Sequence, residues 1–479
     1  MKRLFFGALF FGVGILVGQD TTSILVVGGQ NGETPIETLY LQNELWFVAN
    51  TGSYGKGSSD IYLFNINEGD SITKSITIGG ETEDIAIMAR AIGSEIFILA
   101  MANTFSNSKL EYKIISFNVN TEKTNEISLN TNFLESKILI EIFNDKLSVL
   151  EKSFNQDSLF IVFLDSNLNL MEKKAFEMDR EKPVFDFDFT VSDSLVMISS
   201  FQSDSTSQLV IIHEQGDSLF SVYSDPKLGY FRPQILLIDS NEHYVLGNFV
   251  QSDSNSSDIF IEKFDSNGSL IWSSEFVGNN FDSVSSAILN SNNQICFIGY
   301  TNSFGEGGDF GFGRYDTEFG DYFDYRTLGS NSYEAGKSLV EYKGGYVFFG
   351  YTDGFESALG DLLIYKTNSI GITNSNSYQR LIDKNVSLSV GINNSGETEH
   401  SLELFPNPID QGKTIHLRTR SGLNEVNIVT VSGENIFSEA YNYPQNEVQF
   451  NTSNLVSGVY LIMVSSGSDN ILGKLVILQ

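Results

Sequence analysis

Apolar residues recur along most of the chain in runs of five to eight residues, separated by Gly, Asn, Asp or Ser. The clearest stretch has such runs at 244–249, 258–265 and 270–276, with polar turns between them. Runs that alternate, or that are continuously apolar over this length, are typical of short antiparallel strands joined by hairpins. The pattern therefore predicts an all-β fold.

The strand pattern repeats about every fifty residues. A polar residue ends the third strand of each copy, at Asn67, Asn120, Asp165, Gln215, Asp265, Asp316 and Asn368. Seven copies of a four-stranded unit predict a seven-bladed β-propeller, in which each blade buries its faces against its neighbours. The copies around Asp165 and Gln215 are the most degenerate, so counts of six to eight blades stay open. A pair of β-sandwiches is the alternative, although sandwiches require no fixed period.

The last copy lacks its fourth strand, because a polar stretch at 371–377 follows Asn368. A matching apolar run, ILVVGG at 24–29, lies near the N-terminus instead. We expect this segment to pair into the last blade and close the ring, which would remove exposed strand edges that invite aggregation.

The last three copies share polar and glycine markers at fixed points of the repeat. These are Gly299, Tyr300, Thr301, Gly350, Tyr351, Thr352, Asp258, Asp309, Asp361, Lys263, Lys366, Asp265, Gly268 and Trp272. With these markers the copies resemble the propeller repeats of secreted bacterial proteins. The resemblance implies the fold and says little about activity.

The N-terminus begins with Met1-Lys2-Arg3, continues with only apolar or small residues at 4–18, and turns polar at Gln19. A basic start, a short apolar core and a small residue at Gly18 predict a secretory signal peptide at 1–18. Its apolar core is shorter than the roughly 20 residues of a spanning helix. No later run approaches that length, so we expect no membrane span in the mature chain.

The composition changes after the repeats, which we place at 19–379. After Asn368 the composition shifts to Ser and Asn, and we interpret residues 380–400 as a flexible linker. Residues 401–479 then alternate short β runs with turns, and a stretch of this length predicts a small Ig-like β-sandwich.

The C-terminal domain carries a set of motif residues along its length: Phe405, Pro406, Asn407, Pro408, Gly433, Leu455, Gly458, Tyr460 and Lys474. The set resembles the type A C-terminal sorting domain of Bacteroidetes proteins exported by the type IX secretion system, in which Tyr usually stands at the place of Phe405. The resemblance implies the type IX machinery as a partner. It also implies an extracellular or outer-membrane surface location after signal-peptide removal. An ordinary accessory sandwich is the alternative, with the two prolines only separating linker from strand.

The charge of the chain limits the classes of partner that it can bind, and its cysteine content bears on the core. The chain has 60 Asp and Glu against 29 Lys and Arg, a formal net charge of -31. Such a surface repels phosphate groups, so we expect no nucleic acid partner. Cys296 is the one cysteine and lies in an apolar run, which predicts a small buried hydrophobe.

Candidate chemistry is sparse. Gly216-Asp217-Ser218-Leu219 spells an esterase nucleophile motif, but Gly69-Asp70-Ser71-Ile72 stands at nearly the same point of another copy, and a hairpin turn explains both. The Gly-rich segment 305–313 lacks the Gly-Lys-Ser/Thr of a phosphate loop. We therefore predict no catalytic residue and no cofactor-binding residue.

Metal sites are also weakly indicated. His213, His243, His400 and His416 are too scattered for a zinc pattern. The polar runs 204–207 and 252–258 offer oxygen ligands for calcium but do not match an ordered calcium loop, so we interpret them as solvated turns. Trp46 and Trp272 fall within strands, which favours the core between blades over a sugar-stacking platform.

Two functions stay open. The first is a secreted or cell-surface binding and adhesion protein for an extracellular glycan or protein. The second is a secreted hydrolase or lyase with an active site at the propeller channel. Titratable groups that converge on one channel mouth would favour the enzyme.

Overall fold

The computed structural model describes residues 22–478 with internal gaps. The gaps are 81, 105–108, 133–135, 144, 154–157, 178–188, 192–193, 201–206, 214–228, 240–241, 252–255, 267, 277, 306, 358, 375–376, 384–386, 390–401, 408, 431–434 and 467–468. The expected signal peptide at 1–18 lies outside the described residues and stays a prediction. In the described part of the chain, no helix has the length and apolar character needed to cross a membrane.

Antiparallel sheets of consecutive strands make up the N-terminal four-fifths of the chain, and we call each sheet a blade. Blade 1 holds β2 (Glu33–Leu41), β3 (Glu44–Thr51), β4 (Asp60–Ile66) and β5 (Ile72–Ile78). Blade 2 holds β6 (Asp84–Ile92), β7 (Glu95–Thr104), β8 (Lys109–Asn118) and β9 (Lys123–Asn132). Blade 3 holds β10 (Ser136–Phe143), β11 (Lys146–Ser153), β12 (Ser158–Leu164) and β13 (Leu170–Glu177). Blade 4 holds β14 (Phe189–Val191), β15 (Ser194–Ser200) and β16 (Ser207–His213).

Three further blades follow. Blade 5 holds β17 (Gly229–Asp239), β18 (Glu242–Gln251), β19 (Ser257–Phe264) and β20 (Leu270–Phe276). Blade 6 holds β21 (Asp282–Leu289), β22 (Gln294–Thr301), β23 (Asp309–Asp316) and β24 (Tyr322–Leu328). Blade 7 holds β25 (Glu334–Tyr342), β26 (Gly345–Thr352) and β27 (Asp361–Thr367), and its fourth strand is β1 (Ser23–Val27).

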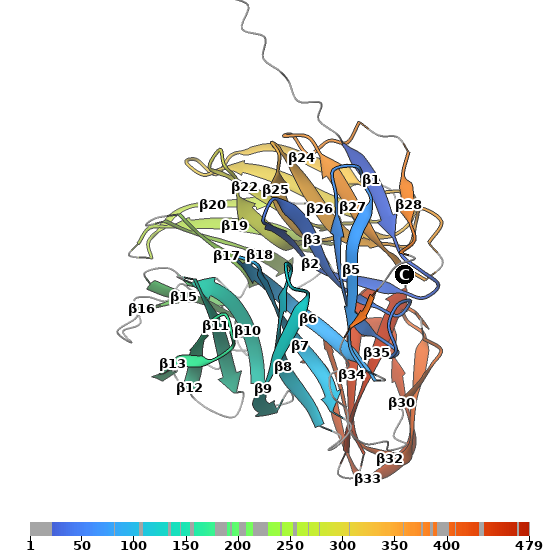
Figure 1. Cartoon of the computed structure of the whole chain (residues 1–479). Helices are drawn as coiled ribbons and strands as arrows, with labels where there is room; N and C mark the ends of the chain where they lie inside the picture. The colour runs from blue at the N-terminus through green and yellow to red at the C-terminus, as the bar shows by residue number, and fades with distance from the viewer. Residues whose placement is uncertain are drawn as a thin grey trace, which may run out of the picture.

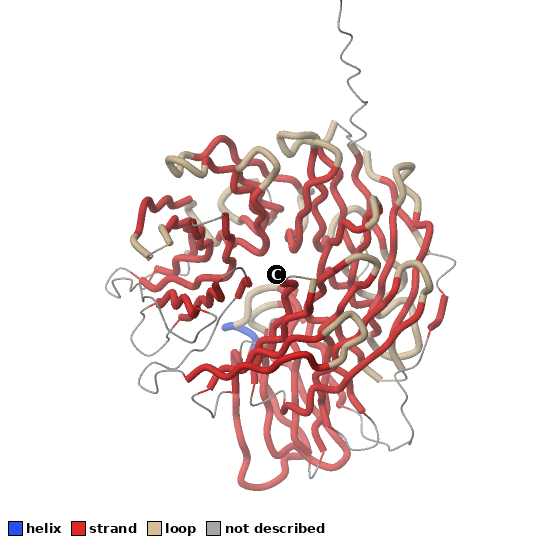
Figure 2. Tube along the Cα trace, turned by 60° about the vertical axis from the view of Figure 1, so that its left-hand side comes forward, coloured by secondary structure: helices blue, strands red, loops and turns tan. Residues whose placement is uncertain are grey.

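The blades form a closed ring (Figures 1 and 2), and we call its inner side the channel. The first strand of each blade contacts the first strand of the next, from β2 through β6, β10, β14, β17, β21 and β25 and back to β2. The first strands are therefore the innermost ones. The fold is a β-propeller, and the expected seven repeats agree with the seven sheets in the described part of the chain.

The ring is closed by the N-terminal segment, as expected. β1 pairs antiparallel with β27, with Leu25 opposite Ile364 and Val26 opposite Leu363. Two short strands continue the closure beyond the last blade: β28 (Gln379–Leu381) runs parallel to β1, and β29 (Ser387–Ser389) runs parallel to β5. Segments that precede and follow the repeats therefore complete blade 7 and extend blade 1.

Apolar side chains fill the spaces between blades. Strands two and three of blade 1 read as nearly continuous apolar runs, because both of their faces are covered by neighbouring blades. Trp46 is only 1% exposed and belongs to the cluster between blades 1 and 2, and Cys296 is fully buried in the cluster that joins blades 6 and 7. Both expectations for these residues are confirmed. Burial raises the pKa of the Cys296 thiol to about 11, so the thiol stays neutral.

The C-terminal domain is a separate β structure with its own core. Its elements are β30 (Leu402–Phe405), β31 (Ile409–Asp410), β32 (Thr414–Thr430), β33 (Asn435–Asn451), a 3-10 helix (Thr452–Asn454), β34 (Gly458–Ser466) and β35 (Asp469–Leu478). The long strands β32 and β33 shift register between Arg418 and Leu423, so β32 pairs with β30 before this point and with β34 after it. One core cluster includes residues from both halves of β32. This arrangement is consistent with the expected small sandwich.

Truncating Leu25, a fully buried residue of β1, should cost about 2–5 kcal/mol of unfolding free energy, because Leu25→Ala opens a cavity where the ring closes. Ile382→Ala, at an exposed position, should change stability by less than about 0.5 kcal/mol. Urea unfolding followed by circular dichroism measures both. An unchanged melting temperature after deletion of residues 20–29 would show that β1 does not close the ring.

Candidate functional site

The repeat markers with carboxylate side chains meet between neighbouring blades. The Asp that begins strand three of one blade lies beside the acid that begins strand one of the next blade, with buried side chains throughout. These acid pairs are Asp60 with Asp84, Asp258 with Asp282, Asp309 with Glu334, and Asp361 with Glu33. All four lie at the end of the propeller where the first strands begin, which we call the start face.

Glycines and threonines of the repeat hold these acid pairs. The backbone N–H of Gly80 donates to Asp84 Oδ2 (2.7 Å), while Oδ1 of Asp60 occupies the place that a Cβ at Gly79 would need. The hydroxyl of Thr352, from a Gly-Tyr-Thr marker, donates to Glu334 Oε1 (2.8 Å). The markers therefore act as contacts within and between blades. Sequence reasoning found the markers and missed this pairing, which links residues of neighbouring blades and, for Asp361 and Glu33, of the last blade and the first.

Each acid pair places two carboxyl groups close together in a buried site. At the 1/2 junction, burial and then the nearby carboxylate of Asp60 raise the pKa of Asp84 to about 7. Burial likewise raises the pKa of Asp60 and of Glu33. Because two adjacent buried carboxylates resist ionising together, we expect one proton to stay in the Asp60 and Asp84 pair at moderate pH. At the 7/1 junction Arg380 forms an ion pair with Asp361 (2.8 Å).

The lysine markers connect blades at the opposite end of the propeller, which we call the turn face because the turns between strands three and four lie there. Lys263 Nζ donates to the carbonyl oxygen of Thr317 in the turn of blade 6 (2.9 Å). Lys366 Nζ donates to the carbonyl oxygen of Asn67 in the turn of blade 1 (3.0 Å) and pairs with Asp70 (2.6 Å). Both lysines are therefore bonded to the next blade.

A line of polar side chains crosses four innermost strands. Arg90 on β6 pairs with Glu37 on β2 (Nη1 to Oε2, 3.0 Å) and with Glu141 on β10 (Nε to Oε2, 2.9 Å). Ser338 on β25 donates to Glu37 Oε1 (2.5 Å). The structure thus brings titratable groups together on the channel side, but both carboxylates are bonded to the same guanidinium.

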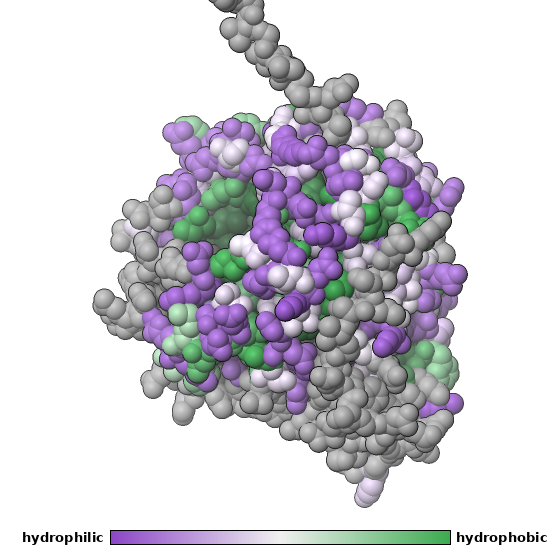
Figure 3. Space-filling model, in the orientation of Figure 1, coloured by the Kyte–Doolittle hydropathy of each residue, from purple (hydrophilic) through white to green (hydrophobic). Residues whose placement is uncertain are grey.

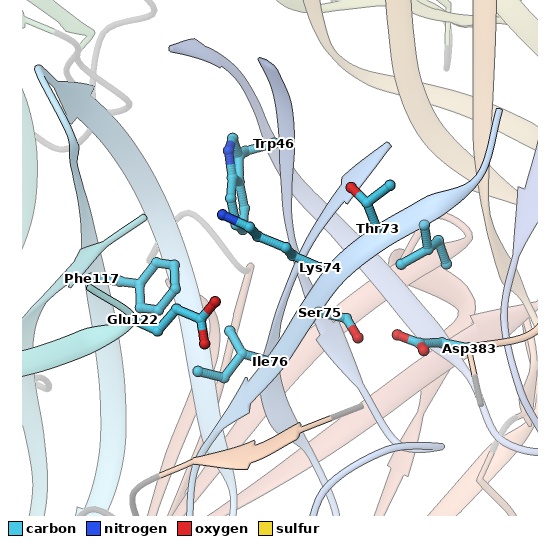
Figure 4. Close-up of a pocket in the computed structure, with 9 residues that line it drawn as sticks. Trp46, Thr73, Lys74, Ser75, Ile76, Phe117, Glu122 and Asp383 are labelled. Carbon is cyan, nitrogen blue, oxygen red and sulfur yellow. The ribbon is translucent and has the colours of Figure 1, made fainter. Parts of the chain in front are cut away.

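A groove of about 240 Å³ lies between blades 1 and 2 (Figure 4). Lys74 of β5 crosses it and donates to the carbonyl oxygen of Val119 (3.3 Å), and Asp383 accepts a bond from the Tyr62 hydroxyl (2.7 Å). Trp46 forms one wall, with its ring edge-on to that of Phe117. The polar groups here join structural elements, and the indole ring is too buried to act as a stacking platform.

Large apolar side chains gather on the turn face of blades 5 and 6. They occupy the first two positions of β20 and of β24 and one position of the turn before β24, and each is 48–68% exposed. We call this set the apolar strip: Leu270, Ile271, Phe319, Tyr322 and Phe323. The two blades touch here, because Gly320 lies directly against the ring of Trp272. In Figure 3 hydrophobic residues also gather over β19 and β20.

The structure places some motif residues of the C-terminal domain in its core and others at its surface. The Phe405 ring stacks on His416 (5.2 Å between centroids), and Asn407 Oδ1 accepts a bond from the backbone of Val476 (2.9 Å). Leu455 and Tyr460 lie in the core. Pro406 is exposed after a cis peptide bond, Gly458 begins β34, and Lys474 pairs with Leu461 in the sheet. Pro408 and Gly433 lie outside the described residues.

The structure also describes some of the turn motifs, polar runs and histidines that the sequence offered as candidates. Residues 69–72 form the turn between β4 and β5, as expected, with Asp70 in the left-handed region (φ 58°). The matching motif at 216–219, the run 204–206, residues 252–255 and His400 lie outside the described residues. His243 is buried and burial lowers its pKa, whereas His416 pairs with Glu447 (2.7 Å). Within the described ranges no group of three or more His, Cys, Asp or Glu is arranged to hold a metal ion.

Comparison with known proteins adds a family for the C-terminal domain. Residues 403–478 match the family described as the secretion system C-terminal sorting domain, which confirms the resemblance drawn from the motif residues. No curated protein matches the chain.

Similar solved structures include a β-propeller domain and WD40 domains, all with low sequence identity. The β-propeller domain of the trilobed protease from Pyrococcus furiosus is 12% identical, with 70% of this chain and 93% of that chain covered and a TM-score of 0.44. The WD40 domain of Neurospora crassa Pan2 is 9% identical, with 72% and 92% covered and a TM-score of 0.43. The WD40 domain of Toxoplasma gondii coronin is 9% identical, with 75% and 89% covered and a TM-score of 0.43.

The acid pairs predict that the propeller loses stability as the pH rises. Because the pKa of Asp84 is raised from 3.8 to about 7 on folding, the stability that its proton provides is complete below about pH 4 and is lost as pH rises through 7. The melting temperature of the Asp84→Asn protein should therefore fall less between pH 5 and pH 9 than that of the native protein. Asp321→Asn, at an exposed turn, is the matched control. An equally steep fall in the Asp84→Asn protein would contradict the role of this pair.

Removing the guanidinium from the channel should destabilise the ring. Arg90→Met leaves Glu37 and Glu141 without their cation, and because all three side chains are mostly buried we expect a loss of about 1–3 kcal/mol. Lys343→Met removes an exposed ion pair with Glu68 and should have no measurable effect. Chemical denaturation of the two variants tests the difference, and equal stabilities would show that the channel pairs are not structural.

Proposed function

We propose that this chain, a β-propeller protein that ends in a secretion system C-terminal sorting domain, is an exported binding protein that adheres to another protein through its apolar strip. The sorting domain indicates export through the type IX machinery. We therefore place the mature protein outside the cell or on the outer-membrane surface, where a partner can reach the propeller.

The apolar strip is the observation that carries the proposal. Single exposed hydrophobic residues are normal on soluble proteins, but a cluster of large ones across two adjacent blades is a typical sign of an interaction surface. The chain as a whole carries a net charge of -31, so an apolar cluster on it is a marked local exception. The strip also lies on the turn face, whereas the C-terminal domain contacts the start face at Tyr333 and leaves the strip uncovered.

The make-up of the strip favours a protein partner over a glycan. Leu270 and Ile271 have no flat ring on which a sugar can stack, and aliphatic side chains gain most from contact with another apolar surface. Phe319, Tyr322 and Phe323 add the aromatic residues that are enriched at the centres of protein interfaces.

The hydrolase or lyase alternative needs a group in the channel that is able to exchange a proton. Glu37 and Glu141 are the channel carboxylates in the described residues of β2 and β10, and Arg90 binds both. This pairing fixes the position of each carboxylate between neighbouring blades, which favours a structural role over proton transfer.

Replacing three strip residues should weaken partner binding at least tenfold, or about 1.4 kcal/mol. The variant is Leu270→Ser, Tyr322→Ser and Phe323→Ser, tested on arrays of extracellular matrix proteins and of glycans. The control is Ile382→Ser with Tyr443→Ser, which also removes exposed apolar side chains but away from the strip. Equal binding by the strip variant and the native protein would overturn the proposal, and so would binding to glycans alone.

A further inference from the structure

The outermost strand of a blade has one backbone edge that faces away from the ring, and at two blades the chain itself covers this edge. β28 lies beside β1 at blade 7 (Figure 1), and β29 lies beside β5 at blade 1. Both added strands run parallel to the strand that they cover. In the described residues, no strand pairs with the outer edge of β9, β13, β20 or β24. Such an edge presents backbone N–H and C=O groups on which another chain can pair.

The two added strands occupy the same place in their blades. Ser387–Ser389 pairs with residues 76–78 at the end of β5, and Gln379–Leu381 pairs with residues 25–27 at the end of β1. In both blades, the covered stretch ends opposite the residue that follows the Asp marker of strand three. The equivalent stretch of blade 5 is 274–276, at the end of β20. The fold therefore has a defined position for a fifth strand.

An aromatic ring marks this position from the next blade. Three blades carry such a ring three residues after the Thr that ends strand two: Tyr54, Phe304 and Phe355. Two of the rings contact residues next to β28. The backbone N–H of Asp383 donates to the Tyr54 hydroxyl (3.3 Å), and the Tyr378 ring packs edge-on against Phe355 (5.2 Å between centroids). The third ring, Phe304, is 39% exposed.

Phe304 of blade 6 stands beside the uncovered edge of blade 5. Its ring packs against Phe276, the last residue of β20 (5.3 Å between centroids). Tyr54 has the same relation to β1, because its hydroxyl donates to the carbonyl oxygen of Gly28 (2.9 Å), and the Gly28 N–H donates to the carbonyl oxygen of Leu381 in β28 (3.4 Å). A strand added to β20 would therefore run past Phe304 at one end and past the strip residues of β20 at the other.

The edge of β20 also has the fewest charges among the uncovered edges. Charged side chains on an edge strand deter pairing with another chain. β13 carries the consecutive residues Glu172, Lys173 and Lys174, and β9 and β24 hold two charged residues each. Glu275 is the one charged residue of β20. The sequence thus protects the edge of blade 3 and leaves that of blade 5 open to pairing.

We propose that an extended segment of the partner protein pairs with β20 as a fifth strand of blade 5, parallel to it. Hydrogen bonds along the backbone hold the segment, and its alternate apolar side chains contact Phe304, Leu270 and Ile271. The net charge of -31 favours Lys or Arg at the remaining positions. This inference rests on the proposed function, because it names the form of partner that the apolar strip binds.

A proline variant tests the backbone edge. Gly28 turns its N–H outward, so Val26, two residues earlier in the same extended strand, does so too. Glu275 is the equivalent of Val26 in blade 5, and Glu275→Pro therefore removes an outward N–H while the pairing of β20 with β19 is kept. Ala175→Pro makes the same change at the equivalent position of β13 and is the matched control.

The probe is a phage library of random linear peptides of about 12 residues, long enough to cover the seven residues of β20, selected on the native full-length protein. We expect the selected peptides to carry apolar residues at alternate positions. Their synthetic forms, titrated by calorimetry, should bind the Glu275→Pro protein at least tenfold more weakly than the native protein, and the Ala175→Pro protein as tightly. Ser273→Pro, which removes the preceding outward N–H, replaces Glu275→Pro if that variant does not fold.

Methylation of the peptide backbone tests the mode of binding on the native protein. An added strand uses every second N–H of the peptide, so N-methyl groups at one set of alternate residues should weaken binding at least tenfold, and those at the other set should not. The inference is wrong if no peptide is selected, if the proline variant binds as the native protein does, or if neither methylated set loses affinity. Binding that the strip variant loses and the proline variant keeps would overturn strand addition and leave the proposed function standing. Binding that only the proline variant loses would do the reverse.

Discussion

A propeller blade is stable only when both of its faces are covered, and this requirement governs the rest of the structure. The inner strands of each blade are apolar on both sides, as in Leu45 to Ala49 of β3, so each needs a neighbour on either side. A row of such blades leaves two uncovered faces unless it closes on itself. The closure by β1, which completes blade 7 with a strand from the other end of the chain, meets this requirement. The short strands β28 and β29 extend the same two blades at their outer edges.

Closure also explains why the repeat keeps polar residues in positions that are buried. Apolar faces fix how far apart two blades lie, but they resist sliding only weakly because apolar contacts have little direction. Hydrogen bonds and ion pairs do have direction. The acid pairs supply such contacts between blades on the start face, and the lysine bonds supply them on the turn face. Blades 2 to 4 keep the hydrophobic pattern while losing most of these markers. At the described starts of β10 and β12 the residues are Ser136 and Ser158 in place of acids.

The hydrophobic pattern was sufficient to predict the strands, their repeat and the closing strand, because each of these depends on period and on which runs are apolar. It did not predict the acid pairs, since Asp60 and Asp84 come together only when two blades pack. The apolar strip was also missed: Leu270 and Ile271 look like ordinary strand residues, and their exposure depends on lying on the outermost strand. The motif at Phe405 to Asn407 identified the sorting domain, while its docking surface depends on packing that no motif encodes.

The sequence of the sorting domain does indicate that it packs against another surface. Residues 459–464 form a continuous apolar run, whereas an outer strand of an isolated two-layer sandwich would alternate apolar with polar residues. The unbroken run means that both faces of β34 are covered, and the domain core accounts for only one of them. Leu461 and Met463 are the residues left over, and the propeller is what covers them. A domain that serves only as a sorting signal needs no second apolar face, and packing against the propeller accounts for this one.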